Sequence, residues 1–128
     1  MEQTKPRHVL IVEDDDGIRE TLQEILLEEG YTVSVAENGR RALDVLSSGR
    51  PLADLIVLDL MMPVMNGQEF RAHQLAHPRW SRIPVVVISA VAPADSWRGG
   101  GARFVAKPFS LDTILGAVSE NLSSPAQA

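Results

Sequence analysis

Five short apolar runs, separated by longer segments of helical periodicity, constrain the fold of this 128-residue chain more than any other feature. An apolar run without alternation is typical of a parallel strand covered on both faces. The pattern therefore predicts strands alternating with helices around a parallel sheet, in the order (βα)5. The strand candidates are Val9 to Val12, Thr32 to Val35, Leu55 to Leu58, Val85 to Ile88 and Arg103 to Ala106. We expect all but the second to be buried on both faces.

The segments between the runs predict amphipathic helices. In the first, an apolar stripe from Ile18 to Leu26 leads to Gly30, a residue suited to closing a helix in a left-handed conformation. Pro78 should stop the third helix, and Ser110 should cap the last one. The later helices are expected at Gly39 to Leu46, Gln68 to Ala76 and Leu111 to Leu122.

The composition favours one globular domain. Hydrophobic residues make up 45% of the chain and charged residues 23%, as in ordinary globular proteins. A net charge of -5 argues against general affinity for nucleic acid or anionic membranes, so a protein or a small ligand is the expected partner. The chain has no cysteine, and no apolar run reaches membrane-spanning length. With no signal-peptide core near Met1, we expect a cytoplasmic protein without membrane insertion.

Polar residues follow four of the five predicted strands. In an open parallel sheet, the functional crevice lies beyond the carboxyl ends of the strands, where the strand order reverses. We therefore expect the side chains at these ends to lie close together. They are Glu13 and Asp14 after the first strand, Asp59 after the third, Ser89 after the fourth and Lys107 after the fifth.

Three carboxylates at one edge would repel each other. Such a group either retains a proton or binds a hard cation. Because the predicted set offers oxygen ligands and neither cysteine nor histidine, it favours Mg²⁺. The sequence thus predicts a magnesium site formed by Glu13, Asp14 and Asp59.

Four stretches in the expected order resemble the signatures of the receiver domain of two-component response regulators. They are "LIVEDD", "VLDLMMPVMNG", "VVVISA" and "FVAKPF". The resemblance covers residues 8 to 122 and implies a flavodoxin-like, doubly wound five-stranded sheet with strand order 2-1-3-4-5. It further implies that residues 1–128 are a single receiver domain with no output domain.

The resemblance also implies roles for the residues at the strand ends. Asp59 corresponds to the phosphoacceptor, and Asp14 to a direct Mg²⁺ ligand with Glu13 beside it, acting directly or through water. Met61 would contribute its backbone carbonyl to the metal. Lys107 would neutralise charge on the transferred group, which family members usually take from a phosphohistidine.

A second set of implied roles concerns switching. Ser89 would hydrogen-bond a phosphoryl oxygen and draw its loop inward, while Phe104 turns toward the vacated space. The bond between Lys107 and Pro108 is commonly cis in this family. Of the four acids after the first strand, the remaining two, Asp15 and Asp16, are expected to cap the first helix.

The sequence departs from the family pattern in two places. The separation of Ser89 and Lys107 is about one helical turn shorter than usual, and Pro93, Trp97 and three glycines lie between them. The helix before the fifth strand is therefore predicted to be short, distorted or absent. The second departure is that Met61 and Val91 are apolar where relatives often carry polar groups that assist the hydrolytic water, so we predict slow self-dephosphorylation.

The function expected from these residues is a stand-alone phosphoryl-accepting switch and not an enzyme. Its donor would be a histidine kinase or a histidine phosphotransfer protein, and its downstream target an unknown protein rather than nucleic acid. Two alternatives remain open. One is a degenerate receiver used as a docking module. The other is a haloacid-dehalogenase-like phosphatase, because "DDD" at Asp14 to Asp16 has the spacing of that family with Asp14 as the nucleophile.

Overall fold

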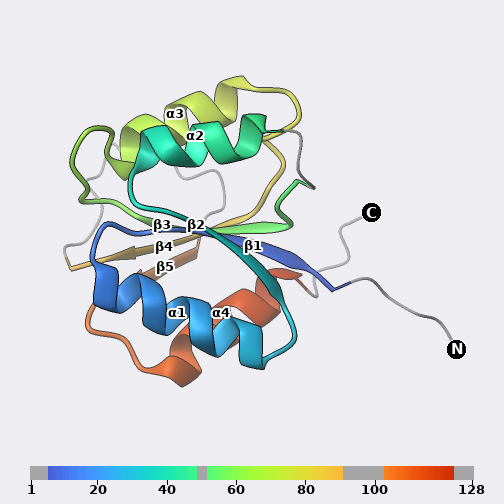
Figure 1. Ribbon diagram of the computed structural model, residues 1–128, viewed down its shortest axis with the longest axis vertical. Coiled ribbons are helices and arrows are strands. Elements are labelled where there is room, and N and C mark those ends of the chain that lie inside the picture. Colours follow the sequence, from blue (N-terminus) through green and yellow to red (C-terminus); the bar gives the residue numbers. More distant parts are fainter. Residues whose placement is uncertain (1–5, 49–51, 91–102, 123–128) are drawn as a thin grey trace, which may run out of the picture.

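Five parallel strands form one sheet between two layers of helices (Figure 1). The computed structural model describes residues 6–48, 52–90 and 103–122. The strand order is β2-β1-β3-β4-β5, so the predicted flavodoxin-like order is confirmed. In chain order the elements are β1 (His8–Val12), α1 (Asp16–Glu28), β2 (Thr32–Ala36), α2 (Gly39–Ser47), β3 (Leu55–Asp59), α3 (Gly67–Ala76), β4 (Val85–Ser89), β5 (Arg103–Ala106) and α4 (Leu111–Leu122).

The helices cover both faces of the sheet. In Figure 1, α1 and α4 lie on one face and α2 and α3 on the other. Each face has its own hydrophobic core, because successive strand residues point to opposite sides. In β1, Val9 and Ile11 pack in the core with α1 and α4, whereas Leu10 and Val12 belong to the core with α2 and α3.

The central strands are buried as predicted, but β5 is not. β1, β3 and β4 are buried along almost their whole length. Of the four residues of β5, only Val105 is buried. The expectation that β5 is covered on both faces was wrong. β5 is an edge strand that pairs with β4 alone, and an edge strand receives less cover from the helical layers than a central one.

The ends of α1 follow from its sequence. Asp15 is the N-cap, and its side chain accepts a hydrogen bond from the backbone N–H of Ile18 at 2.9 Å. Gly30 has a φ of 95°, the left-handed conformation that glycine adopts without steric cost. The predicted cap and stop of this helix are both confirmed.

The later helices also agree with the sequence, to within one residue at each end. The predicted irregular helix between β4 and β5 falls at residues 91–102, which lie outside the described residues. Among the described residues, no helix is both long enough and apolar enough to cross a bilayer.

Gly67 joins the end of β3 to the start of α3. A Cβ atom at this position would lie 2.5 Å from the carbonyl oxygen of Asp59 and 2.8 Å from Cα of Leu60. Both are backbone atoms and cannot move aside cheaply. The close approach of α3 to the end of β3 therefore requires glycine here.

We predict that Gly67→Ala lowers the free energy of unfolding by about 1–3 kcal/mol, as overpacking typically does. Gly116→Ala in α4 is the matched control, because a Cβ there meets no atom within 4 Å. The control should be stabilising by roughly 0.5–1 kcal/mol through reduced chain entropy. Urea unfolding of both variants measures the difference, and equal effects would contradict the account.

Candidate functional site

The carboxyl ends of β1, β3, β4 and β5 bring the predicted side chains to one edge of the sheet. Asp59 and Ser89 are the last residues of β3 and β4, and Lys107 follows β5 directly. The register places Asp59 beside Ile88, and Ser89 beside Ala106. The carbonyl of Ser89 accepts a hydrogen bond from the N–H of Lys107 at 2.8 Å. Parallel pairing thus fixes the relative positions of these three residues.

Three carboxylates converge at this edge. Glu13, Asp14 and Asp59 each present an oxygen, and the three oxygens all lie within 4.8 Å of one another. Glu13 is fully buried and Asp59 nearly so, while Asp14 is exposed to solvent. This is the only such group of potential metal ligands among the described residues.

Lys107 compensates part of this negative charge. Its Nζ lies 2.9 Å from Oε1 of Glu13 and 3.6 Å from Oδ1 of Asp59, so it is closer to the glutamate than to the aspartate. Oε1 of Glu13 is buried and, within the described part of the chain, accepts no hydrogen bond of good geometry. The positive charge of Lys107 compensates the negative charge of this oxygen. The oxygen can therefore still bind a cation.

The protonation of Asp59 reflects these surroundings. Burial and the nearby charge of Glu13 raise the pKa of Asp59 to about 7, although Lys107 and the N–H of Met61 act in the opposite direction. For Lys107, burial lowers the pKa, but the close contact with the Glu13 carboxylate, together with the charge of Asp59, outweighs burial and raises the pKa. Without a second cation, Asp59 is therefore held between its neutral and charged forms near neutral pH.

The four acids after β1 divide into two pairs. Asp15 caps α1, and its N–H donates to Oε2 of Glu13 at 3.0 Å. Asp16, in the first turn of α1, forms an ion pair with Arg19. The side chains of Asp15 and Asp16 thus interact with the first turn of α1, as predicted. The side chains of Glu13 and Asp14 lie near Asp59.

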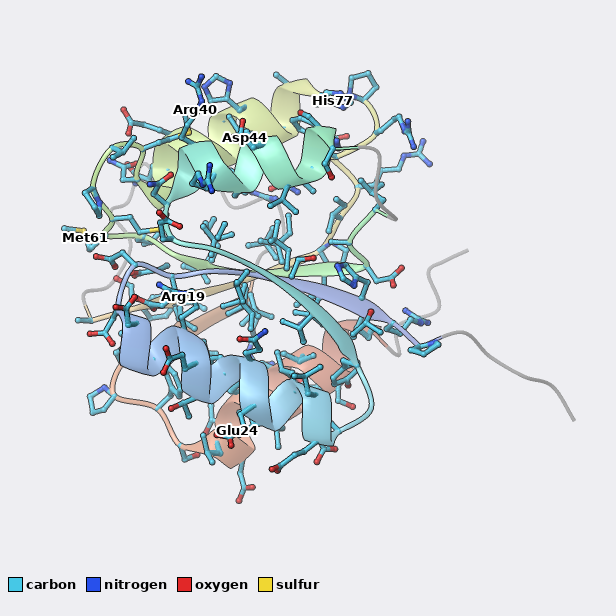
Figure 2. The ribbon with its side chains drawn as sticks, in the orientation of Figure 1. Arg19, Glu24, Arg40, Asp44, Met61 and His77 are labelled. Atoms are coloured by element: carbon cyan, nitrogen blue, oxygen red, sulfur yellow. The ribbon has the colours of Figure 1, made fainter. Side chains whose placement is uncertain are left out.

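The loop between β3 and α3 forms the outer rim of the site. The N–H of Met61 donates to Oδ1 of Asp59 at 3.3 Å, while Met61 as a whole is 64% exposed. Figure 2 shows Met61 at the edge of the molecule where the strands end. Asn66 closes the loop through a capping box with Glu69. The sequence alone did not reveal this role of Asn66, although Asn followed three residues later by Glu is a known signal.

The remaining predicted residues lie near the cluster. Ser89 is fully buried at the end of β4, whereas Phe104 on β5 is 36% exposed. The bond between Lys107 and Pro108 is cis, as the resemblance implied. Val91 lies outside the described residues.

The donor set fits a magnesium ion. Mg²⁺ prefers oxygen ligands at about 2.1 Å in octahedral geometry, so ligand oxygens are about 3 Å apart when adjacent and about 4.2 Å apart when opposite. The three carboxylate oxygens lie within 4.8 Å of one another, so side-chain movements could bring them around one such ion. A bound cation would also offset the burial and the Glu13 charge that together raise the pKa of Asp59.

The fold and the site together define a class: a doubly wound α/β domain with an acidic cluster and a lysine beyond its strand ends. Comparison with known families identifies it further. Residues 9–119 match the response regulator receiver domain, and the chain belongs to that family.

Curated relatives and solved structures agree with this assignment. Response regulator MprA of Mycolicibacterium vanbaalenii is 38% identical over 117 residues, which cover 86% of this chain and 48% of that protein. The chain therefore spans about half the length of this relative. Chemotaxis protein CheY4 of Vibrio cholerae superposes with a TM-score of 0.82 at 30% identity, over 92% of this chain and 100% of that one.

A third relative was solved with a metal. Response regulator TrrA of Thermotoga maritima, determined in complex with Mg²⁺ and BeF, superposes with a TM-score of 0.77 at 32% identity. The match covers 91% of this chain and 99% of that one.

We predict that, in Mg²⁺-free buffer, Asp59→Asn becomes more stable relative to the wild type as pH rises. The pKa of Asp59 is about 7 in the folded protein, against an ordinary value of 3.8. A raised carboxyl pKa contributes stability at low pH that is lost as pH rises through the folded value. The relative gain between about pH 5 and pH 8 should be about 2–3 kcal/mol.

Urea unfolding across this pH range measures the effect, and saturating Mg²⁺ is its control. The added cation should reduce the advantage of the variant. A stability difference that does not change with pH would contradict the raised pKa of Asp59.

Proposed function

We propose that this receiver domain accepts a phosphoryl group on Asp59 from a phosphohistidine of a histidine kinase or histidine phosphotransfer protein. In this step, a bond forms between a carboxylate oxygen of Asp59 and phosphorus, and the bond from phosphorus to the histidine nitrogen breaks. The single observation that carries the proposal is the position of Asp59, buried beside two other carboxylates and 3.6 Å from the Lys107 ammonium.

Glu13, Asp14 and Asp59, with the backbone carbonyl of Met61, would hold Mg²⁺ in this proposal. When bound, the ion supplies positive charge that neutralises the transferred phosphoryl oxygens and favours ionised Asp59. The ligand role of Asp14 is supported by its exposed carboxylate within the cluster. Glu13 is already engaged by Lys107 and by the N–H of Asp15, which favours a contact through water.

Lys107 and Ser89 would act on the phosphoryl group from the side of β4 and β5. The Lys107 ammonium, which lies between Glu13 and Asp59, can shift toward the new phosphoryl oxygens. Ser89 would donate its hydroxyl to one of them and draw in the loop after β4. Phe104, partly exposed here, would then turn inward, so that a local charge alters the surface presented to a protein partner.

The domain would act as a cytoplasmic switch between a histidine-containing protein donor and a protein target. The phosphatase hypothesis has weaker support, because it requires Asp14 as the nucleophile. Lys107 contacts Glu13 and Asp59 within 4 Å, and the buried, strongly perturbed carboxyl group is that of Asp59. No observation specifically favours a docking module without phosphorylation.

We predict that a small phosphodonor with Mg²⁺ modifies Asp59 and no other residue. Mass spectrometry of the intact protein and of its peptides should locate the added phosphoryl group on the peptide containing Asp59. Asp59→Ala should show no modification. Asp14→Asn should still be modified on Asp59, but only at higher Mg²⁺ concentration, because one metal ligand has been weakened. A phosphoryl group on Asp14, or an unchanged yield in Asp59→Ala, would reject the proposal.

A second prediction concerns the lifetime of the phosphorylated state. The Met61 side chain lies at the rim beside Asp59 and cannot orient a water molecule by a hydrogen bond. Met61→Asn should accelerate phosphate loss by up to about tenfold, since one net hydrogen bond contributes up to roughly 1.4 kcal/mol. The apolar control Met61→Leu should leave the rate unchanged. The decay of phosphorylated protein after donor removal measures both, and an unchanged or slower rate in Met61→Asn would exclude this role.

A further inference from the structure

Arg19 holds the backbone of the loop that carries Glu13 and Asp14. Its Nη1 atom donates to the carbonyl oxygen of Glu13 at 3.0 Å and to that of Asp14 at 3.4 Å. Its Nη2 atom pairs with Oδ1 of Asp16 at 2.5 Å. The side chain is only 17% exposed, and Figure 2 shows the residue near the start of α1. One guanidinium group therefore contacts three of the four acidic residues that follow β1.

Arg19 contacts the backbone carbonyl groups of Glu13 and Asp14 and not their carboxylates. The carbonyl groups of Glu13 and Asp14 point toward Arg19, whereas their side-chain oxygens converge on Asp59. The N–H of Asp15 further holds the Glu13 side chain through Oε2. The orientation of both carboxylates thus depends on how the loop backbone is held.

We infer that Arg19 is a positioning residue for the divalent cation, acting through the backbone of Glu13 and Asp14 without touching the ion. This inference rests on the proposed function, in which those two residues help to hold Mg²⁺. The planar guanidinium suits the role, since its several N–H donors reach two carbonyl groups and one carboxylate at once. A lysine ammonium has the same charge but lacks this fork.

Charge and geometry give opposite expectations for Arg19. Arg19 brings a positive charge close to a cation site. If charge were the only effect, removing Arg19 would therefore strengthen Mg²⁺ binding. Removing a residue that orients the ligands instead weakens metal binding, typically by about 10-fold to 100-fold. The direction of the change therefore separates the two accounts.

Titration calorimetry of Mg²⁺ into wild type, Arg19→Met, Arg19→Lys and the control Arg40→Met provides the test. Arg40 is an exposed arginine on α2, in the other helical layer (Figure 2). We expect about 10-fold weaker binding for Arg19→Met, an intermediate loss for Arg19→Lys and no change for Arg40→Met. Tighter or unchanged binding in Arg19→Met, or wild-type affinity in Arg19→Lys, would overturn the inference.

A second measurement separates positioning from loss of overall stability. Amide hydrogen exchange in the metal-free protein should accelerate at Asp15, whose N–H binds Glu13, more than at the core strand β3 in Arg19→Met. Uniform acceleration would indicate general destabilisation and overturn the inference. If the wild type itself binds no Mg²⁺, both the proposed function and the role of Arg19 are rejected. If the wild type binds Mg²⁺ and the Arg19 variants bind it equally well, only the role of Arg19 is rejected.

Discussion

The gathering of like charges at the ends of parallel strands is the constraint on which the rest of this structure depends. Glu13 and Asp59 are buried, and their oxygens lie within 4.8 Å of each other and of Asp14. Lys107 offsets part of the repulsion, yet it lies nearer to Glu13 than to Asp59. Burial, together with the nearby charge of Glu13, therefore keeps the pKa of Asp59 near 7. The cluster is thus an energetic cost to the folded chain that a divalent cation or protonation of Asp59 relieves.

The surrounding fold keeps this unfavourable arrangement in place. Strand pairing fixes Asp59 against β4, and the fully buried strands β3 and β4 leave little freedom for its backbone. Gly67 allows α3 to begin against the backbone of Asp59. On the other side, Asp15 and Arg19 hold the loop after β1. Rigid elements on both sides therefore maintain a site whose charges would otherwise separate.

Sequence reasoning predicted much of this arrangement, and its failures have physical causes. The burial of β1, β3 and β4 was evident because unbroken apolar runs are characteristic of central parallel strands. The exposure of β5 was not predicted, because the sequence of these four residues does not reveal whether the strand lies at the edge or in the centre of the sheet. The convergence of the acids at one edge followed from the rule for strand ends. Periodicity could not indicate that Arg19 reaches back to two carbonyl groups, because a charged residue near a helix start is usually solvated.

The most direct test of the account is a crystal structure of this domain with Mg²⁺ and beryllofluoride, a mimic of the phosphoryl group. The account predicts one octahedral ion bound at about 2.1 Å by carboxylate oxygens of Asp14 and Asp59, with beryllium attached to Asp59 and Lys107 shifted toward its fluorines. A beryllofluoride group on another carboxylate, or an ion that does not contact both Asp14 and Asp59, would contradict it.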